Sequence, residues 1–356
     1  MSGRIKTLRG EIDAIDEKIL SLLNKRISFV KKIGKLKEKK GIESFDPARE
    51  ENILSKIARL NSKDTRPGKF EPVFKEIFSL SRSFEKPFKV AYLGPEGSFT
   101  HLAALKYFGE NCNYMPARRI QDVFELTEKQ ECELGVVPIE NSNEGTVGLT
   151  LDMLVDSNIK LCGEIYQEIA LNLIGKDTDL SGIKKIYSHA QALAQCRLWL
   201  DRNMPGVNLM EVESTSEAAR RAAENPSSAA IASAKSAEIY GLSIINSRIE
   251  DGTSNYTRFI ILGKSSAGLT GKDKTSVIIS LPDESGSLYY ALGAFSKYKI
   301  NLSKIESRPI KKKAWEYLFF IDFDGHVSQK VVKKTISELV RICLSLKVLG
   351  SYPRSR

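Results

Sequence analysis

One cationic side chain interrupts the apolar face of a predicted helix near the start of the chain. Apolar residues recur at intervals of three and four from Ile5 to Leu36, which predicts one long amphipathic helix. Arg26 occupies a position on this face where the next aliphatic residue is expected. Burying a guanidinium is costly unless an anion meets it. Arg26 therefore indicates either an anion-binding site in a helical core or an ion pair with a partner helix that sets its register.

Two further cations on the same helix differ in their distance from Arg26. Lys37 lies about 16 Å from Arg26 along the helix axis and within roughly 20° of it around the axis. The two long side chains can therefore bind one small dianion from opposite ends. Arg9 lies about 25 Å from Arg26, too far to reach the same ligand on a straight helix. If Arg9 serves this site, it comes from a second, antiparallel protomer. The spacing predicts a dimer with shared sites.

Two more helices are predicted within the first 86 residues. Asp46-Pro47 is an N-cap with proline in the first turn, and it opens a helix that runs through Asn61. A third apolar stripe runs from Phe70 to Phe84. Polar side chains accompany both helices: Arg49 and Glu50 near the start of the second, and Ser81 and Glu85 along the edge of the third.

These three helices resemble the all-helical chorismate mutase domain over about the first 86 residues. The resemblance implies the pericyclic rearrangement of chorismate to prephenate, in which an enzyme holds the diaxial conformer and stabilises charge on the breaking ether oxygen. It implies carboxylate-binding roles for Arg9 from the second protomer, Arg26, Arg49 and Ser81, ether-oxygen contacts for Lys37 and Glu85, and ring-hydroxyl contacts for Asp46 and Glu50. Glu85 can donate a hydrogen bond only when it is protonated. We therefore expect mutase activity to fall as pH rises, unless Glu85 is only a solvated carboxylate at a helix end.

Polar clusters follow three predicted strands in the middle of the chain. The strand at 89–93 is followed by Gly-Pro-Glu-Gly-Ser-Phe-Thr-His at 94–101. The strand at 135–139 is followed by Glu140, and the strand at 183–187 is followed by Ser188. Glycines at a strand-to-helix turn can expose backbone N–H groups to an anion, although many such turns only reverse the chain. Open α/β sheets bind ligands at the carboxyl ends of their strands, so a ligand site is predicted there. Ser214-Thr215-Ser216-Glu217 is instead interpreted as a helix-capping box.

Roughly residues 88–265 resemble prephenate dehydratase. The match is carried by Gly94–His101, by Val137–Ser142 and by the triplet Thr257-Arg258-Phe259. The resemblance implies a two-lobed α/β domain like the periplasmic binding proteins, with its site in the cleft. There, carbon dioxide and a ring hydroxyl leave prephenate together to give phenylpyruvate.

The same resemblance assigns Thr257 as the acid that helps the hydroxyl to depart. An alcohol is a very weak acid, so Glu140 and His189 are candidates to support it, although a histidine at a helix start can also be a simple cap. Arg258 either binds the substrate carboxylates or forms a structural ion pair, and Phe259 either desolvates the departing carboxylate or packs in the core. The remaining polar lining is expected from Ser98, Thr100, Asn141, Ser142, Ser188, Gln191 and Gln195.

A linker at 263–271 precedes a third pattern of elements. A strand at 277–281, a helix at 288–298, strands at 300–309 and 315–323, a helix at 329–343 and a strand at 347–352 are predicted. This ferredoxin-like order resembles the ACT regulatory domain, which implies phenylalanine binding at a dimer interface and inhibition of the dehydratase. The candidate effector-binding residues are Gly286, Ser287, Leu288, Glu306, Ser307, Arg308 and Pro309. Ser285 and Ser287 replace the proline and alanine usual in this loop, and their hydroxyls could weaken or alter effector binding.

Composition and charge are consistent with three domains. The 356 residues carry a net charge of +10, but residues 1–86 and 272–356 each hold a surplus of eight positive charges and 87–271 a surplus of six negative charges. This partition disfavours a single basic nucleic-acid binder. The five cysteines are scattered without a CxxC pair, so neither a disulfide framework nor a zinc site is expected. No secretory or membrane-spanning segment is recognised, and a soluble, cytoplasmic protein is expected.

Together these features predict an all-α chorismate mutase domain at 1–86, an α/β dehydratase domain at 88–265 and an α+β ACT domain at 272–356. The chain resembles the bifunctional chorismate mutase–prephenate dehydratases, which implies chorismate and prephenate as substrates, phenylalanine as effector, no cofactor, and a homodimer or higher homo-oligomer. No nucleic-acid or membrane partner is expected. Two alternatives remain: a second domain that acts on arogenate, and a non-catalytic amino-acid sensor, against which Arg9, Arg26, Lys37 and Thr257 argue.

Overall fold

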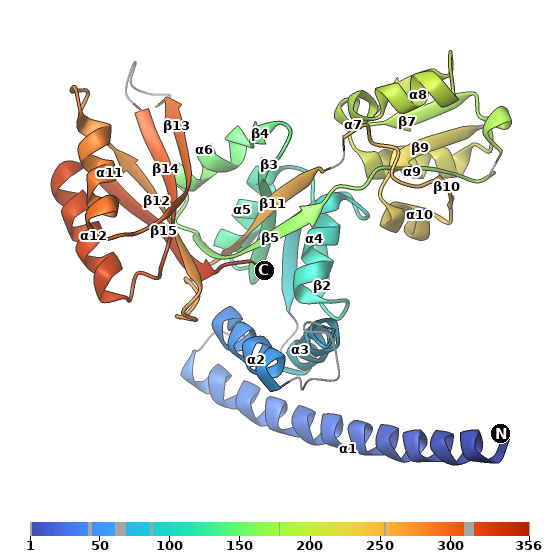
Figure 1. Cartoon of the computed structure of the whole chain (residues 1–356), viewed down its shortest axis with the longest axis horizontal. Helices are drawn as coiled ribbons and strands as arrows, with labels where there is room; N and C mark the ends of the chain where they lie inside the picture. Colours follow the sequence, from blue (N-terminus) through green and yellow to red (C-terminus); the bar gives the residue numbers. More distant parts are fainter. Residues whose placement is uncertain are drawn as a thin grey trace.

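The structure, a computed structural model, describes residues 2–41, 45–60, 69–85, 88–177, 179–252, 254–309 and 317–355. Three regions follow one another along the chain (Figure 1): N-terminal helices, a two-lobed α/β region, and a C-terminal region of one sheet with helices. The first lobe of the middle region contacts both of the other regions, whereas the second lobe projects away from them.

The helical region consists of α1 (Ser2–Lys40), α2 (Pro47–Leu60) and α3 (Glu71–Glu85). Asp46 caps α2, because its Oδ1 accepts a hydrogen bond from the Arg49 backbone N at 2.9 Å, and Pro47 takes the first helical position. The three predicted helices are confirmed, while Asn61 and residues 66–68 lie outside the described residues. Among the helices that the structure describes, none has the length and apolar character needed to cross a membrane.

Only the C-terminal half of α1 packs against the other helices. Gly34 lies so close to α3 that a Cβ there would be 3.3 Å from Glu85 Cα. The N-terminal half of α1 extends beyond α2 and α3 (Figure 1). Its apolar side chains remain 49–66% exposed: Ile5, Leu8, Ile12, Ile15, Ile19 and Leu22. On the C-terminal half, Phe29, Ile33 and Leu36 are also 43–60% exposed. One copy of the described chain therefore leaves most of this amphipathic face uncovered.

The first lobe of the middle region is built on a mixed sheet with the order β2-β1-β3-β11-β5, and a short β4 pairs with β3. Its strands are β1 (Lys89–Leu93), β2 (Asn113–Ala117), β3 (Leu134–Asn141), β4 (Gly145–Thr146), β5 (Lys160–Glu168) and β11 (Tyr256–Gly263). Its helices are α4 (Phe99–Phe108), α5 (Ile120–Glu128) and α6 (Gly148–Asp156). β1, β2 and β3 run parallel, so their carboxyl ends share one edge, and β11 returns antiparallel between β3 and β5.

The second lobe has its own sheet, with the order β10-β6-β9-β7-β8. The strands are β6 (Asn172–Gly175), β7 (Lys185–Ser188), β8 (Asn208–Glu211), β9 (Ser228–Ala232) and β10 (Ser243–Asn246). The helices are α7 (Ala190–Gln195), α8 (Arg197–Asn203), α9 (Thr215–Glu224) and α10 (Ala234–Tyr240), with a 3₁₀ turn at Leu180–Gly182. The chain enters this lobe after β5 and returns before β11, and each lobe has a separate apolar core. The predicted two-lobed α/β architecture is confirmed.

The C-terminal region has the predicted βαββαβ order. Its elements are β12 (Asp273–Ser280), α11 (Ser287–Lys297), β13 (Leu302–Pro309), β14 (Tyr317–Asp324), α12 (Lys330–Ile342) and β15 (Ser345–Pro353). The antiparallel sheet has the order β13-β14-β12-β15, and α11 and α12 share an apolar core with one of its faces. The ferredoxin-like fold is confirmed, although the first residues of the strand predicted at 315–323 lie outside the described residues.

The other face of this sheet shares a core with the first lobe. Leu349 and Tyr352 from β15 are buried in the same cluster as Leu161 and Ile260 from the lobe. At Gly350 the two backbones approach so closely that a Cβ would lie 2.1 Å from Leu161 O. Only glycine permits such an approach, so the two regions form a tight joint.

Two candidate active sites

A pocket of about 540 Å³ opens among the three N-terminal helices. Seven of the eight predicted mutase residues line it: Arg26, Lys37, Asp46, Arg49, Glu50, Ser81 and Glu85. Arg9 does not, because it lies on the exposed N-terminal half of α1, away from α2 and α3. The structure therefore brings together the cations Arg26, Lys37 and Arg49, and it agrees with the expectation that Arg9 cannot reach its own chain's site.

The cations of this pocket are held by short contacts from α3. Arg26 Nη1 donates a hydrogen bond to Ser81 Oγ, and Lys37 Nζ lies 3.6 Å from Glu85 Oε2. Burial lowers the pKa of Arg26 below its ordinary value. The negative charge of the nearby Glu50 opposes this effect, and the positive charge of Arg49 adds to it. Three cations that converge on one pocket, one of them desolvated, attract an anion, so the pocket is suited to a small dianion.

Arg82 is a functional candidate that the sequence did not reveal. Its Nη1 donates to Glu50 Oε1 and its Nη2 donates to the backbone O of Phe108 at 2.5 Å. The side chain is buried and also lines the pocket. Arg82 lies off the apolar stripe that runs from Phe70 to Phe84, so the helical pattern places it toward solvent, and no local signal could have identified it.

A second pocket, of about 340 Å³, lies between the two lobes of the α/β region. Eight of the predicted dehydratase residues line it: Ser98, Thr100, Asn141, His189, Gln191, Gln195, Thr257 and Phe259. They come from the carboxyl ends of β1 and β3, from β11, and from α7 in the second lobe. The polar clusters that follow separate strands in the sequence thus meet in one cleft.

A chain of side-chain amides holds Thr257 in this cleft. Asn141 Nδ2 donates to Thr257 Oγ1 at 2.9 Å and to Asn255 Oδ1 at 2.9 Å. Asn255 Nδ2 in turn donates to Gln195 Oε1 at 3.0 Å, which links the two lobes. Because Thr257 Oγ1 already accepts a hydrogen bond, its own proton is available to a ligand, and the donated bond makes the hydroxyl a better proton donor.

The cleft contains groups that can bind an anion, and one carboxylate, Glu213, also lines it. The N-termini of α4 and α9 open toward it, capped by Ser98 and Ser214, whose Oγ atoms accept from the backbone N of His101 at 3.2 Å and of Glu217 at 3.0 Å. The predicted cap at Ser214 is confirmed, and Ser214 also lines the pocket. Arg118 lines it too and was not predicted, although it directly follows β2 at the same sheet edge as the other clusters.

His189 has the geometry of a helix cap. Its Nδ1 accepts a hydrogen bond from Gln191 N at 3.4 Å at the start of α7, while its ring also lines the cleft. The capping interpretation is therefore confirmed, and a supporting role toward Thr257 stays a prediction. Within the part of the chain that the structure describes, no three His, Cys, Asp or Glu side chains form a group that could hold a metal ion.

Arg258 does not line the cleft. Its Nε donates to Glu164 Oε2 at 2.8 Å, its Nη1 to Asp322 Oδ2 at 2.5 Å and its Nη2 to the Tyr352 hydroxyl at 3.0 Å. Glu164 lies on the neighbouring strand β5, and Asp322 and Tyr352 lie on β14 and β15 of the C-terminal sheet. The structure therefore corrects the substrate-binding assignment of Arg258 in favour of the structural ion pair, because neighbouring residues on a strand face opposite sides of the sheet.

Three other predicted cleft residues also lie outside the lining. Glu140 pairs in register with Arg258, and its Oε2 lies 3.0 Å from Lys304 Nζ of the C-terminal region. Ser188 Oγ donates to Ile231 O at 2.7 Å, and Ser142 Oγ accepts from Tyr256 N at 3.0 Å. These hydroxyls satisfy backbone groups instead, and the Glu140 carboxylate faces the C-terminal region rather than Thr257.

The predicted effector-binding residues lie at two places in the C-terminal region. Gly286, at a φ of 88°, precedes Ser287 and Leu288 at the start of α11. Glu306, Ser307, Arg308 and Pro309 end β13, an edge strand of the sheet. Arg308 Nη2 donates to Asp152 Oδ1 at 2.9 Å, so it contacts α6 of the first lobe. Effector binding by these residues stays a prediction.

Comparison with known proteins yields family matches over most of the chain. The family model of chorismate mutase type II matches residues 8–86, that of prephenate dehydratase residues 90–267, and that of the ACT domain residues 275–340. A bifunctional chorismate mutase/prephenate dehydratase of Aquifex aeolicus is 46% identical over 356 residues, which cover 99% of this chain and 98% of the relative. A bifunctional chorismate mutase/prephenate dehydratase of Pseudomonas aeruginosa is 40% identical over 358 residues, which cover 99% of this chain and 98% of that relative.

A solved structure is similar to the middle and C-terminal regions. It is the prephenate dehydratase of Arthrobacter aurescens in complex with L-Phe, which is 34% identical and superimposes with a TM-score of 0.69 over 75% of this chain and 90% of that one. The extent of the sequence matches, in the same domain order, leaves one assignment. The chain belongs to the family of bifunctional chorismate mutase/prephenate dehydratases.

Proposed function

We propose that the helical region, residues 1–86, converts chorismate to prephenate, and that the cleft of residues 88–265 converts prephenate to phenylpyruvate. The observation that carries the first activity is the pocket in which Arg26, Lys37 and Arg49 converge. The observation that carries the second is Thr257, held by Asn141 in a cleft faced by two helix N-termini and Arg118.

The mutase reaction needs positioning and charge stabilisation rather than a nucleophile. Arg26 and Arg49 bind the two carboxylates of chorismate and hold its diaxial conformer, in which the bond-forming carbons are close. Lys37 donates a hydrogen bond to the ether oxygen as negative charge develops there. Glu85, whose Oε2 lies 3.6 Å from Lys37 Nζ, contacts the same ether oxygen. Asp46 and Glu50 accept from the ring hydroxyl, and Ser81 holds Arg26 in place.

A second copy of the chain completes this site. The exposed apolar stripe from Ile5 to Leu22 is expected to be buried in an interface. A second α1 that runs antiparallel can bury it, because its own stripe has the same length and pattern. The same arrangement brings Arg9 of each protomer to the site of the other, where it binds a substrate carboxylate. The assembly is at least a homodimer with two shared mutase sites.

The dehydratase reaction uses the asymmetry of the cleft. Arg118 and the N-termini of α4 and α9 bind the carboxylate that remains in the product. The other carboxylate faces Phe259, Ile169 and Leu171, where poor solvation favours its departure as carbon dioxide. Thr257 donates its proton to the ring hydroxyl, which leaves as water as the ring becomes aromatic. His189, whose ring lines the same cleft, replaces that proton in this proposal.

Phenylalanine is the proposed effector of the C-terminal region. The similar dehydratase of Arthrobacter aurescens was solved with L-Phe bound. In this chain the expected binding residues lie at the start of α11 and on the edge strand β13, where a second sheet can pair. Ser285 and Ser287 add hydroxyls to this loop, so we expect weaker inhibition than in relatives with proline and alanine there.

Incubation of the purified protein with chorismate alone tests both activities. Prephenate and phenylpyruvate are followed separately, and both are expected to form. Prephenate without phenylpyruvate would overturn the second activity and direct the next assay to arogenate. No loss of chorismate would overturn the first and favour an amino-acid sensor. Addition of phenylalanine to the same reaction is expected to lower phenylpyruvate formation.

A further inference from the structure

Arg82 is the most deeply buried charge of the helical region, and it lies where that region meets the first lobe. It comes from α3, yet both of its terminal nitrogens bond to groups on other elements: Nη1 to Glu50 on α2 and Nη2 to the carbonyl of Phe108 at the end of α4. Its side chain is only 6% exposed. A guanidinium buried to this degree requires a defined set of partners.

Aromatic rings from three separate segments enclose this guanidinium. The Arg82 Cζ atom lies 5.8 Å from the ring centre of Phe45 and 6.0 Å from those of Phe88 and Phe108. These distances are within the range of cation–π attraction, and rings that exclude water strengthen the bond to Glu50. The cage is rigid, because Phe88 and Phe108 belong to the core of the first lobe. Arg82 is thus held in place by residues of the first lobe.

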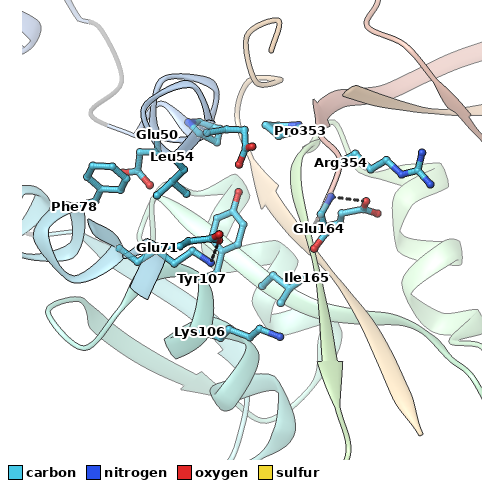
Figure 2. A pocket seen from close by; sticks show the side chains of 14 residues that line it. Glu50, Leu54, Glu71, Phe78, Lys106, Tyr107, Glu164, Ile165, Pro353 and Arg354 are labelled. Atoms are coloured by element: carbon cyan, nitrogen blue, oxygen red, sulfur yellow. Dashed lines mark hydrogen bonds and ion pairs between the residues drawn. The ribbon is translucent and has the colours of Figure 1, made fainter. Parts of the chain in front are cut away.

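Glu50 needs such a fixed partner because it borders two hollows. It lines the mutase pocket, and it also lines a separate hollow of about 200 Å³ between the helical region, the first lobe and the end of the chain (Figure 2). In that second hollow it is joined by Tyr107 of α4 and Glu164 of β5. A glutamate with space on both sides has more than one accessible rotamer, and only one of them serves the substrate.

We propose that Arg82 is a positioning residue of the mutase reaction, which holds the Glu50 carboxylate toward the ring hydroxyl of chorismate. The proposal rests on the proposed role of Glu50 in binding that hydroxyl. It makes the first lobe part of the support of the mutase site, because the other end of Arg82 is anchored on Phe108. Arg82 itself does not touch the reacting atoms.

The charge of Arg82 also affects the protonation of Glu50. Burial raises the pKa of Glu50 above its ordinary value, and Arg82 opposes this effect by attraction and by its hydrogen bond. Other charged or titratable groups line the two hollows with Glu50. In the mutase pocket they are Arg26, Lys37, Asp46, Arg49 and Glu85, and in the second hollow they are Glu51, Glu71, Lys75, Lys106, Tyr107, Glu164 and Arg354. Without Arg82 the pKa of Glu50 rises further, so the ionised carboxylate that accepts from the hydroxyl is lost at a higher pH.

The test compares full-length Arg82→Met, Arg82→Lys, Glu50→Gln and the double variant Arg82→Met with Glu50→Gln. Lys75→Met is the matched control, because it removes a cation from the same helix that lines the second hollow beside Glu50 but pairs at 3.0 Å with Glu71. For each protein, kcat and KM are measured separately with chorismate and with prephenate. The acid side of the mutase pH profile is recorded for the wild type, Arg82→Met and Lys75→Met.

We expect Arg82→Met to lower mutase kcat/KM by on the order of 10- to 100-fold, with dehydratase kcat/KM within about twofold of the wild type. Arg82→Lys recovers part of this loss, since it keeps the charge but cannot bond both partners. The double variant is no worse than Glu50→Gln alone, because both changes remove the same function. The acid limb of the mutase profile shifts to higher pH in Arg82→Met and stays in place in Lys75→Met.

Three results would overturn the proposal. An Arg82→Met protein with wild-type mutase activity and pH profile, beside a defective Glu50→Gln, would refute the positioning role while leaving the role of Glu50 intact. Full activity of Glu50→Gln would refute both. If Arg82→Met loses both activities through misfolding, Arg82→Lys decides: a mutase loss with dehydratase activity retained supports the proposal, and unchanged mutase activity overturns it.

Discussion

Arg258 Nη1 lies 2.5 Å from Asp322 Oδ2, and this buried ion pair joins the strand that carries Thr257 to the sheet of the C-terminal region. Thr257 and Arg258 are adjacent on β11, but one faces the cleft and the other faces the sheet of the C-terminal region. Movement of that sheet relative to the first lobe must therefore strain the pair or move β11 beside the proposed acid. The two regions have no space to move closer at Gly350, because its backbone is in contact with that of Leu161.

The first prediction concerns this ion pair. Arg258→Met leaves the buried carboxylate of Asp322 without its cation, and we expect it to destabilise the protein by roughly 3–5 kcal/mol. Replacing both partners, Arg258→Met with Asp322→Leu, is expected to recover part of this loss, because no unpaired charge remains. Chemical unfolding followed by far-UV circular dichroism provides the measurement. Equal stability of Arg258→Met and the wild type would show that the pair contributes nothing.

The second prediction concerns Thr257. Thr257→Ala removes the proposed proton donor, and we expect dehydratase kcat to fall by about 10²- to 10⁴-fold. Prephenate formation from chorismate is expected to stay unchanged, because the mutase pocket is in another region. Thr257→Ser, which keeps the hydroxyl, is the matched control and should retain most activity. Simultaneous loss of both reactions would indicate unfolding rather than a chemical role.

The third prediction concerns Arg118. We expect Arg118→Met to raise KM for prephenate by about 10-fold or more, because a charged hydrogen bond contributes roughly 1.5–3 kcal/mol. Arg118→Lys should recover part of this loss, and the neighbouring Arg119→Met should have no effect, since Arg119 is exposed and pairs with Asp122. Steady-state kinetics with prephenate give the answer. An unchanged KM in Arg118→Met would assign carboxylate binding to the helix N-termini alone.

The fourth prediction concerns Glu85 in the mutase site. Its Oε2 is buried and accepts no hydrogen bond from the residues that the structure describes. Glutamine at this position keeps a hydrogen-bond donor for the ether oxygen, whereas alanine does not. We therefore expect Glu85→Gln to retain mutase kcat/KM within about tenfold and Glu85→Ala to lose about 10²-fold or more. Glu71→Gln on the same helix serves as the control. Equal mutase activity of Glu85→Ala and the wild type would refute this role.

The predictability of each site residue depended on how local its signal was. Arg26 could be identified because it breaks an apolar repeat within its own helix, and Thr257 because it lies in a characteristic triplet. The orientation of Arg258 could not be derived, because it depends on carboxylates more than 60 positions away at Glu164 and Asp322. Arg82 is enclosed by three rings from outside its own helix, two of which, Phe45 and Phe108, lie more than 25 positions away. A residue enclosed by such contacts leaves no pattern in its own helix.

The last prediction tests the shared mutase site. Arg9→Ala and Arg26→Ala proteins should each lose mutase activity, because every site then lacks one carboxylate ligand. In a mixed dimer, the Arg26 of one protomer meets the intact Arg9 of the other, so one site is whole and the second lacks both arginines. Random exchange of subunits makes half of the dimers mixed, so about a quarter of wild-type mutase activity should return. The two variants are mixed, unfolded and refolded together, and assayed with chorismate, with each variant refolded alone as the control. No recovery in the mixture would place Arg9 outside the mutase site and leave the apolar stripe of α1 as a contact surface only.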